Sequence, residues 1–225
     1  MRWLLLIILL TGCAAIPLSP APQVDRVPTG TLDAVAARTS LAALPLAQPG
    51  RLDGYVRDCS DDKACVFGQP WFDTDGDGCD QRSQVLARDL TGVTRKPGRC
   101  GVQSGTLDDP YTGSRVTSVS KIQIDHVVPL AEMWRSGAAT WAPDRRLAAA
   151  NDLRNLVAVS SKVNQSKSDK TPDEWMPPNA GYSCSYGRMY VTVKAAYGLS
   201  VAPAERTALE NALVSCDAAP AGTTK

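Results

Sequence analysis

The sequence predicts an α+β domain with a few short strands and a larger number of helices. Two runs rich in β-branched residues, 122–128 and 155–159, have the composition of strands. Apolar residues recur at intervals of three and four in 186–197 and 209–216, as they do along the buried face of a helix. We therefore expect an N-terminal disulfide-stapled segment, a strand–strand–helix core and added helices.

The first 13 residues have the pattern of a bacterial lipoprotein signal peptide. Leu4–Leu10 is uninterrupted and apolar, but it is too short to span a bilayer as a helix. Leu10–Cys13 resembles a lipobox, in which Cys13 becomes the lipid-modified first residue. The alternative is an ordinary secretory signal followed by an incidental cysteine. The lipobox predicts a protein anchored by its lipid at the extracellular face of the bacterial cell membrane, or secreted.

Three further segments are expected after the signal peptide. Residues 14–50 are predicted to form a tether with a short helix, because 14–30 is rich in Pro, Ala and Ser and 31–44 has apolar residues at helical spacing. Residues 51–217 are long enough to form one domain with its own core. Residues 218–225 are expected to be a flexible tail, and the protein is expected to be a monomer.

Six cysteines remain when Cys13 is set aside, and an even number in an exported chain indicates three disulfides. No Cys-x-x-Cys pair occurs and the chain has one histidine, which argues against a structural zinc site. The pairing favoured by proximity in the sequence is Cys59–Cys65, Cys79–Cys100 and Cys184–Cys216.

An acidic loop begins at Asp73 and matches the opening of a calcium-binding loop, with Asp73, Asp75 and Asp77 at ligand positions. Position twelve of this loop is Gln84, where calcium loops have a bidentate glutamate. This difference disfavours Ca²⁺, and an Asp/Gly-rich turn stapled by Cys79 is the favoured alternative. A calcium-stabilised adhesion module would depend on this loop alone.

The main candidate for chemistry is His126, the single histidine in the chain. It follows Asp125 at the end of the first strand-like run, which Pro129 terminates. The second strand-like run leads to a helix that carries Asn164 and has serines near its start. A strand–strand–helix unit of this kind can bring Asp125, His126 and Asn164 together. A lone histidine is otherwise more often a satisfied core residue.

Four motif segments occur in order: D-H-x-x-P-L from Asp125, N-L-x-x-V from Asn155, N-x-x-K-S-D-K from Asn164, and E-W-M-P-P at 174–178. Together they resemble the secreted HNH endonucleases of the ββα-metal, or His-Me finger, superfamily. The resemblance implies a ββα-metal (HNH) core. It also implies hydrolysis of nucleic acid to leave a 5′-phosphate and a 3′-hydroxyl. The substrate is expected to be DNA or RNA, with DNA favoured.

Phosphodiester hydrolysis needs a general base and a cation that offsets the developing negative charge. His126 suits the role of base, since it is neutral and basic near pH 7. Asp125 and Asn164 suit Mg²⁺ or Mn²⁺, which prefer oxygen ligands. Many HNH enzymes have histidine where Asn164 stands, and its absence disfavours zinc. By the same resemblance, Asn155 ties down the loop between the strands and orients His126.

Three cations are candidate phosphate contacts. Lys167 lies one helical turn after Asn164, although a solvated helix lysine is an equal alternative. Arg82 has the planar fork that suits phosphate, although such an arginine more often pairs with a local aspartate. Lys170 belongs to a basic group around the motif, in a chain whose net charge is only +1. The alternative function is a non-catalytic cell-envelope lipoprotein that binds a partner or wall polymer.

Overall fold

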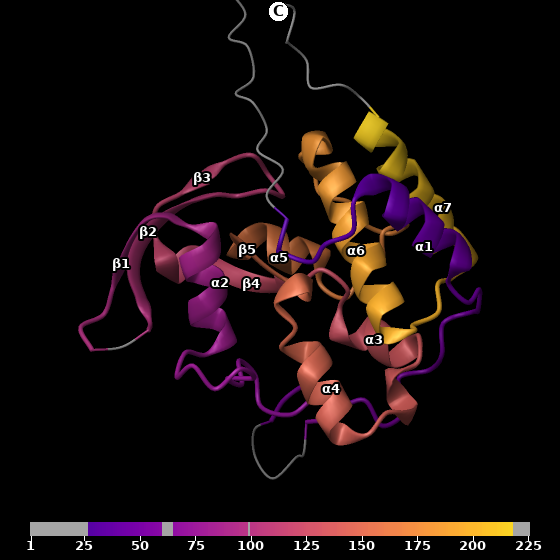
Figure 1. Ribbon diagram of the computed structural model, residues 1–225, viewed down its shortest axis with the longest axis horizontal. Helices are drawn as coiled ribbons and strands as arrows, with labels where there is room; N and C mark the ends of the chain where they lie inside the picture. Colours follow the sequence, from indigo (N-terminus) through magenta and orange to yellow (C-terminus); the bar gives the residue numbers. More distant parts are fainter. Residues whose placement is uncertain (1–26, 60–64, 99, 218–225) are drawn as a thin grey trace, which may run out of the picture.

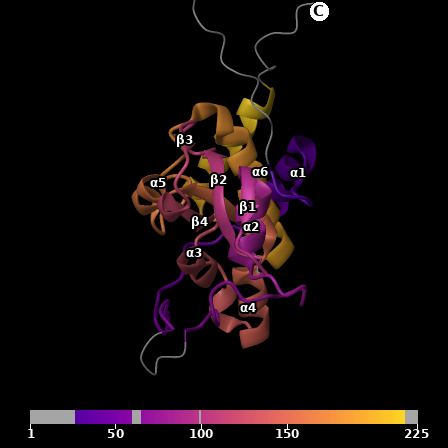
Figure 2. The ribbon, with the colours of Figure 1, turned by 90° about the vertical axis from the view of Figure 1, so that its left-hand side faces the viewer.

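The computed structural model describes residues 27–59, 65–98 and 100–217. Figure 1 shows small sheets on one side of the molecule and a group of helices on the other. The view in Figure 2 has β1 and β2 towards the viewer, with α5 at one edge of the molecule and α1 at the opposite edge. The predicted α+β class is confirmed. The predicted signal peptide with Cys13, residues 14–26 of the predicted tether, and the predicted tail lie outside the described residues.

The strands form two antiparallel sheets within the described part of the chain. The first sheet has the order β1-β2-β3, with bounds Thr91–Arg95, Val102–Asp108 and Arg115–Val116. The second sheet pairs β4 (Ile122–His126) with β5 (Leu156–Ser160), and Asp125 faces Val157 across the pair. Helix α5 (Ser161–Lys167) begins immediately after β5. These three elements are the strand–strand–helix unit that the sequence predicts.

Three local expectations from the sequence are wrong: a turn or loop over residues 105–113, pairing of residues 115–121 near β4, and a serine cap at the start of α5. Residues 105–113 are not all turn, because their first part continues β2. Residues 115–121 contribute β3, which pairs with β2 and not with β4, since the 3₁₀ turn Val119–Lys121 separates the two strands. Ser160 precedes α5 but makes no side-chain capping bond. Its backbone is held by the pairing with Ile122.

The remaining α-helices agree closely with the periodicity of the sequence. Their bounds are α1 Ala34–Ala43, α2 Gln81–Asp89, α3 Leu130–Arg135, α4 Pro143–Ala150, α6 Ser183–Tyr197 and α7 Pro203–Val214. Proline begins α4 and α7, where its missing N–H has no helical partner to lose. Gly198 ends α6 in the left-handed conformation, with φ of 64°. In the part of the chain that the structure describes, no helix combines the length and apolar character needed to cross a membrane.

Helix α1 belongs to the folded domain, so the domain begins before residue 51. Ala37 and Leu41 are buried, and α1 packs against α6 and α7. Arg38 also donates a hydrogen bond to the carbonyl of Leu213 at 2.7 Å. The small side chains of the Ala-rich α1 allow it to pack closely against its neighbours. The short helix expected next to the tether is therefore fixed to the core.

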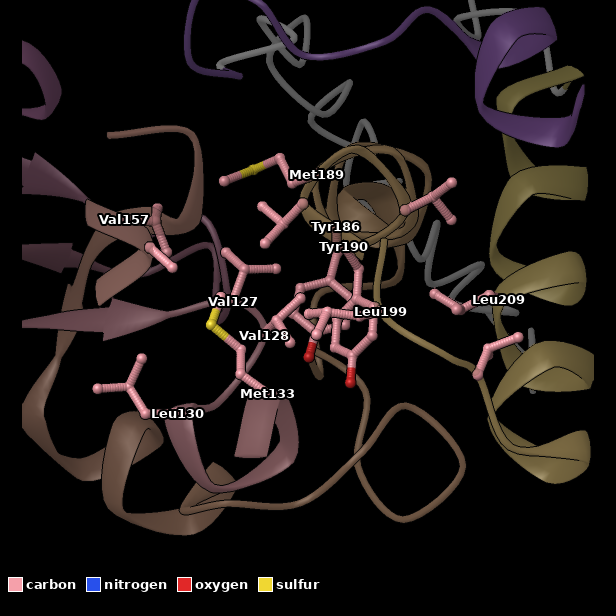
Figure 3. Close-up of a cluster of buried hydrophobic side chains, with 14 of the residues drawn as sticks. Val127, Val128, Leu130, Met133, Val157, Tyr186, Met189, Tyr190, Leu199 and Leu209 are labelled. Carbon is pink, nitrogen blue, oxygen red and sulfur yellow. The ribbon is translucent and has the colours of Figure 1, made fainter. Parts of the chain in front are cut away.

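The main apolar core lies between the strand–strand–helix unit and the C-terminal helices. Figure 3 shows Val127, Val128 and Met133 directed towards Tyr186 and Tyr190 of α6. All five side chains are fully buried. The segment immediately after His126 is therefore fixed by the largest core of the molecule, which limits the movement of the strand end.

A group of buried charges connects three helices of this core. Lys194 of α6 forms ion pairs of 2.7 Å with Glu132 of α3 and with Glu205 of α7. Tyr190 donates a hydrogen bond to Glu205 at 2.7 Å. Burial raises the pKa of Glu132, and the charge of Lys194 opposes that effect. The three helices are thus linked by groups that would be costly to bury singly.

The structure contains the three predicted disulfides, which confirms the pairing by sequence proximity. They are Cys59–Cys65, Cys79–Cys100 and Cys184–Cys216. The first two hold loops that precede the strand–strand–helix unit and the third joins α6 to the end of α7. Such links reduce the conformational freedom of the unfolded chain, and each typically contributes about 2–4 kcal/mol.

Candidate functional site

A cleft of about 360 Å³ brings together the residues that the sequence singled out. Asp125 and His126 at the end of β4, and Asn164 in α5, all line it. A larger and more open cleft of about 750 Å³ lies between the β1–β2 hairpin and residues 78–83. None of the predicted catalytic or metal residues lines that second cleft. The smaller cleft is therefore the candidate site.

The imidazole of His126 has a defined tautomer. Its Nε2 lies 2.8 Å from the carbonyl oxygen of Ala150 in α4. A carbonyl oxygen only accepts hydrogen bonds, so Nε2 must carry the hydrogen, and Nδ1 keeps a lone pair. Burial, with the nearby positive charge of Arg57, lowers the pKa of His126 to about 3. The ring is therefore neutral at neutral pH and can accept a proton at Nδ1.

An aromatic ring supports the imidazole from the side. The ring of Trp71 is nearly parallel to that of His126, at an interplanar angle of 16° and a centroid distance of 6.2 Å. Trp71 has φ of 60°, which is uncommon for a residue other than glycine. Such a conformation costs about 1–3 kcal/mol and persists only where neighbouring structure fixes it. No pattern in the sequence predicts that Trp71 lies beside His126.

The carboxylate of Asp125 is buried, with only 5% of its surface exposed. Its Oδ1 accepts a hydrogen bond from Lys167 Nζ at 3.0 Å, and its Oδ2 accepts one from the hydroxyl of Tyr111 at 2.6 Å. Burial raises the pKa of Asp125, whereas the charge of Lys167 and the bond from Tyr111 lower it. Burial also raises the pKa of Tyr111, which keeps its hydroxyl protonated as a donor.

Lys167 does not occupy either of the positions expected for it. It is fully buried, so it is not a solvated helix lysine, and its Nζ donates to Asp125 and to the carbonyl oxygen of His126 at 2.8 Å. These bonds hold the ammonium inside the protein. Lys167 therefore positions the end of β4. Tyr111, which no motif in the sequence marks, has a similar positioning role through its bond to Asp125.

Asn155 holds the chain that leaves β4. Its Oδ1 accepts a hydrogen bond from the Val128 N–H at 2.8 Å, and its Nδ2 donates to the Val128 carbonyl at 3.0 Å. The backbone carbonyl of Asn155 also accepts a bond from the Val127 N–H at 2.8 Å. The side chain is completely buried. It fixes the two residues that follow His126 and has no direct access to the cleft.

The donor set in the cleft fits a divalent cation that is held by few protein ligands. Asn164 Nδ2 donates to Gln123 Oε1 at 2.9 Å, which directs the amide and leaves Oδ1 available as a ligand. Each carboxylate oxygen of Asp125 accepts one hydrogen bond from the protein and has a second lone pair. One carboxylate and one amide oxygen suit Mg²⁺ or Mn²⁺, which take their other ligands from water and phosphate.

Arg82 and Lys170 lie outside the lining of this cleft. Arg82 Nη2 donates to the carbonyl of Ile122 at 3.1 Å, at the start of β4. Lys170 is exposed, and its Nζ donates to the carbonyl of Ser166 at 2.9 Å. The structure does not bring either cation together with His126. It places another cation, Arg57, in the cleft lining, and no sequence pattern distinguished that arginine.

The acidic loop forms a self-bonded turn. Asp73 accepts hydrogen bonds from the N–H groups of Gly76 and Gly78 at 2.8 and 2.9 Å. The carboxylates of Asp73, Asp75 and Asp77 lie close enough together to share an ion. Gln84 directs its Nε2 towards Asp75, at 3.0 Å, and so supplies a donor where a calcium ligand would be required.

Two comparisons with known proteins found similarity to this chain. The family described as GmrSD restriction endonucleases, C-terminal domain, matches residues 80–211, which is more than half of the chain. A protein of Arthroderma benhamiae, named "Uncharacterized secreted protein", is 40% identical over 200 residues, covering 88% of this chain and 91% of the relative. The search of solved structures found no match. The family match contains Asp125, His126 and Asn164.

Proposed function

The chain belongs to the GmrSD restriction endonuclease C-terminal domain family, a family of nucleases, and from this membership we propose that it is an HNH endonuclease. It would hydrolyse phosphodiester bonds in nucleic acid, DNA in preference to RNA, with Mg²⁺ or Mn²⁺. The observation that carries the proposal is the shared cleft. A neutral imidazole with a free Nδ1 lines the same cleft as a carboxylate and an amide oxygen.

In the proposed reaction, His126 Nδ1 takes a proton from water as the water oxygen bonds to phosphorus. Asp125 and Asn164 would hold the divalent cation, which supplies positive charge to offset the charge that develops on the phosphate. Lys167, Tyr111 and Asn155 keep these groups in position.

The order of bond changes follows from the expected products. The bond from phosphorus to the 3′ oxygen is intact until the water oxygen attacks, and it then breaks as the new bond to phosphorus forms. The phosphate stays on the 5′ oxygen, and the departing 3′ oxygen takes a proton from solvent to become the 3′-hydroxyl. His126 later returns its proton to solvent, which its low pKa favours.

We also propose that the protein acts outside the cell, as a monomer anchored by a lipid on Cys13. The three disulfides fit an extracellular location, because such bonds persist in oxidising compartments. Cys13 is left over from this pairing, as a lipid-modified cysteine would be. Mass spectrometry of the mature N-terminus tests the proposal, and an unmodified cysteine or cleavage at another residue would contradict it.

The test of the function is digestion of plasmid DNA and of RNA by the mature chain, produced with its disulfides formed. We expect cleavage with Mg²⁺ or Mn²⁺ and none with excess chelator. His126→Ala should lower the rate by about 10²–10⁴-fold, the usual contribution of a positioned base. A wild-type protein that cleaves neither nucleic acid with either metal would refute the proposal, and so would full activity in His126→Ala.

The metal assignment has a matched pair of variants in α5. Asn164→Ala should raise the Mn²⁺ concentration needed for half-maximal activity and weaken Mn²⁺ binding measured by calorimetry. Gln165→Ala, at the exposed neighbouring position, should change neither quantity. Equal behaviour of the two variants would show that Asn164 is not a metal ligand.

A further inference from the structure

We propose that Arg57 binds the phosphate that is cleaved, through a non-bridging oxygen, on the wall of the cleft formed by residues 52–57. The inference rests on the proposed function and adds a substrate-binding residue to it. Arg57 lies outside residues 80–211, the part of the chain that matches the nuclease family. The site would therefore depend on a segment that precedes the family domain.

The position of Arg57 next to His126 is established by two cavities. Arg57 lines the candidate cleft together with Asp125, His126 and Asn164. It also lines a second, much smaller cavity of about 10 Å³, together with His126 and Trp71. Because Arg57 borders both spaces around the imidazole, its side chain is placed to contact a phosphate that lies beside His126.

The guanidinium of Arg57 is available to a ligand. Arg57 is exposed, and among the described residues its side chain has neither an ion pair nor a hydrogen bond. The neighbouring cations are engaged: Arg135 pairs with Asp169 at 3.1 Å, and Lys167 is buried against Asp125. Among the described residues that line the cleft, Arg57 is thus the one cation.

The backbone that carries Arg57 is anchored on both sides. Two residues before it, the ring of Tyr55 packs against Trp134 at a centroid distance of 5.9 Å. One residue before it, the carbonyl of Val56 accepts a hydrogen bond from the Val66 N–H at 3.0 Å. Two residues after it, Cys59 is joined to Cys65. Because the backbone is already fixed, only the side chain of Arg57 has to lose conformational freedom when it binds an anion.

The chemistry of the group matches a phosphodiester. A guanidinium offers two parallel N–H donors, which match two oxygens of a phosphate, and its charge is permanent. Asp125 faces the same cleft and would repel a phosphate in the absence of a cation. Arg57 supplies positive charge from the protein itself, at a site that the divalent cation need not occupy.

The experiment compares Arg57→Gln and Arg57→Lys with Arg51→Gln, a matched control. Arg51 is also exposed and belongs to the same segment, but it is paired with Asp53 at 2.7 Å. Two single-stranded DNA oligonucleotides serve as substrates. One is ordinary, and the other has a single phosphodiester among neutral methylphosphonate linkages, so that only the phosphate to be cleaved carries charge.

We expect Arg57→Gln to lower kcat/KM by about 10- to 100-fold on both oligonucleotides, which corresponds to the loss of one charged hydrogen-bonding group. The kcat/KM of Arg57→Lys should lie between the values for Arg57→Gln and wild type, because lysine keeps the positive charge but lacks the paired N–H donors of the guanidinium. Arg51→Gln should match wild type. Unchanged thermal unfolding temperatures would show that the exposed substitutions leave the fold intact.

Binding gives a readout that does not require catalysis. Binding is measured in the His126→Ala background with chelator present. For the ordinary oligonucleotide, we plot the logarithm of the association constant against the logarithm of the salt concentration, and Arg57→Gln should make the slope of this plot shallower by about 0.7. It should also weaken binding of the singly charged oligonucleotide, whereas Arg51→Gln should not.

The inference is overturned if Arg57→Gln matches Arg51→Gln in cleavage and binding. It is also overturned if Arg57→Gln affects the ordinary oligonucleotide alone, since Arg57 would then contact a neighbouring phosphate. In both cases wild type still cleaves DNA and the proposed function stands. A wild-type protein without nuclease activity would instead defeat the proposed function itself.

Discussion

Lys167→Met provides a direct test of how the site is held together. The substitution keeps the length and apolar stem of the side chain but removes the ammonium that pairs with Asp125 at 3.0 Å and bonds to the His126 carbonyl at 2.8 Å. Both partners of the ion pair are almost completely buried, so water cannot replace the lost group. Asp125 would keep one hydrogen bond, from Tyr111.

The expected loss of stability is large. Removal of one partner of a buried ion pair costs about 3–5 kcal/mol, out of about 5–15 kcal/mol for a typical domain. With a urea dependence of about 2 kcal/mol per molar, the unfolding midpoint should fall by about 1.5–2.5 M. Lys170→Met is the matched control, since Lys170 is exposed and follows the same helix. It should change stability by less than about 0.5 kcal/mol.

The pH dependence identifies the cause of this loss. Burial raises the pKa of Asp125 above its value in the unfolded chain, so folding favours the protonated carboxyl. The stability that Asp125 contributes in this way is complete at low pH and is lost as pH rises through its pKa in the folded protein. Without Lys167 that pKa rises further. The difference in stability between wild type and Lys167→Met should therefore be small near pH 3.5 and should grow up to pH 7.

A second substitution completes the test. Asp125→Asn removes the charge that Lys167→Met leaves unpaired and keeps an acceptor for Tyr111. The double variant should recover at least about 1.5 kcal/mol relative to Lys167→Met, within the usual range of coupling between residues in contact. The reasoning would be refuted if Lys167→Met lay within about 1 kcal/mol of wild type at pH 7, or if its effect did not change with pH.

Three other predictions concern the same site and the staples around it. Because the chain has one histidine, NMR can follow His126 alone, and in the metal-free protein its ring should remain neutral from pH 8 down to pH 5; a midpoint near 6.5 would contradict the burial of the ring. Tyr111→Phe should lower the free energy of unfolding by about 1.5–3 kcal/mol in urea titrations, because the charged acceptor Asp125 loses the hydrogen bond that the Tyr111 hydroxyl donates to it; an unchanged unfolding midpoint would show that the hydroxyl is not needed. Thiol titration of the denatured, unreduced domain should find no free thiol among residues 51–217, and two or more free thiols would refute the three-disulfide pairing.

The sequence predicts the strand–strand–helix unit well because its signals are local. The β-branched run before His126 and the helix of Asn164 are readable from composition and spacing, and the structure places both residues in one cleft. The disulfides were also predictable, since each pair joins the nearest available cysteines. Where neighbours in sequence are also neighbours in space, the sequence is a sufficient guide.

The errors concern contacts between residues that are distant in the sequence. In the sequence, Lys167 looks like a surface residue. It is buried because the fold brings it to Asp125, which lies 42 positions earlier in the chain. Tyr111 and Arg57 reach the site from loops whose course no periodicity records. The short helix expected over residues 31–44 is present as α1, but its place in the core depends on α6 and α7, more than a hundred residues later, which no local pattern indicates.

The buried charges around Lys194 determine how small a working piece of this protein can be. A fragment with only the strand–strand–helix unit would carry Glu132 without Lys194, and a fragment that ended before α7 would carry Lys194 without Glu205. Each truncation would leave a charge without its ion-pair partner, or would expose an apolar surface that another helix buries. The nuclease-like unit is therefore not portable, and grafting it into another protein would require α3, α6 and α7 to be transferred with it.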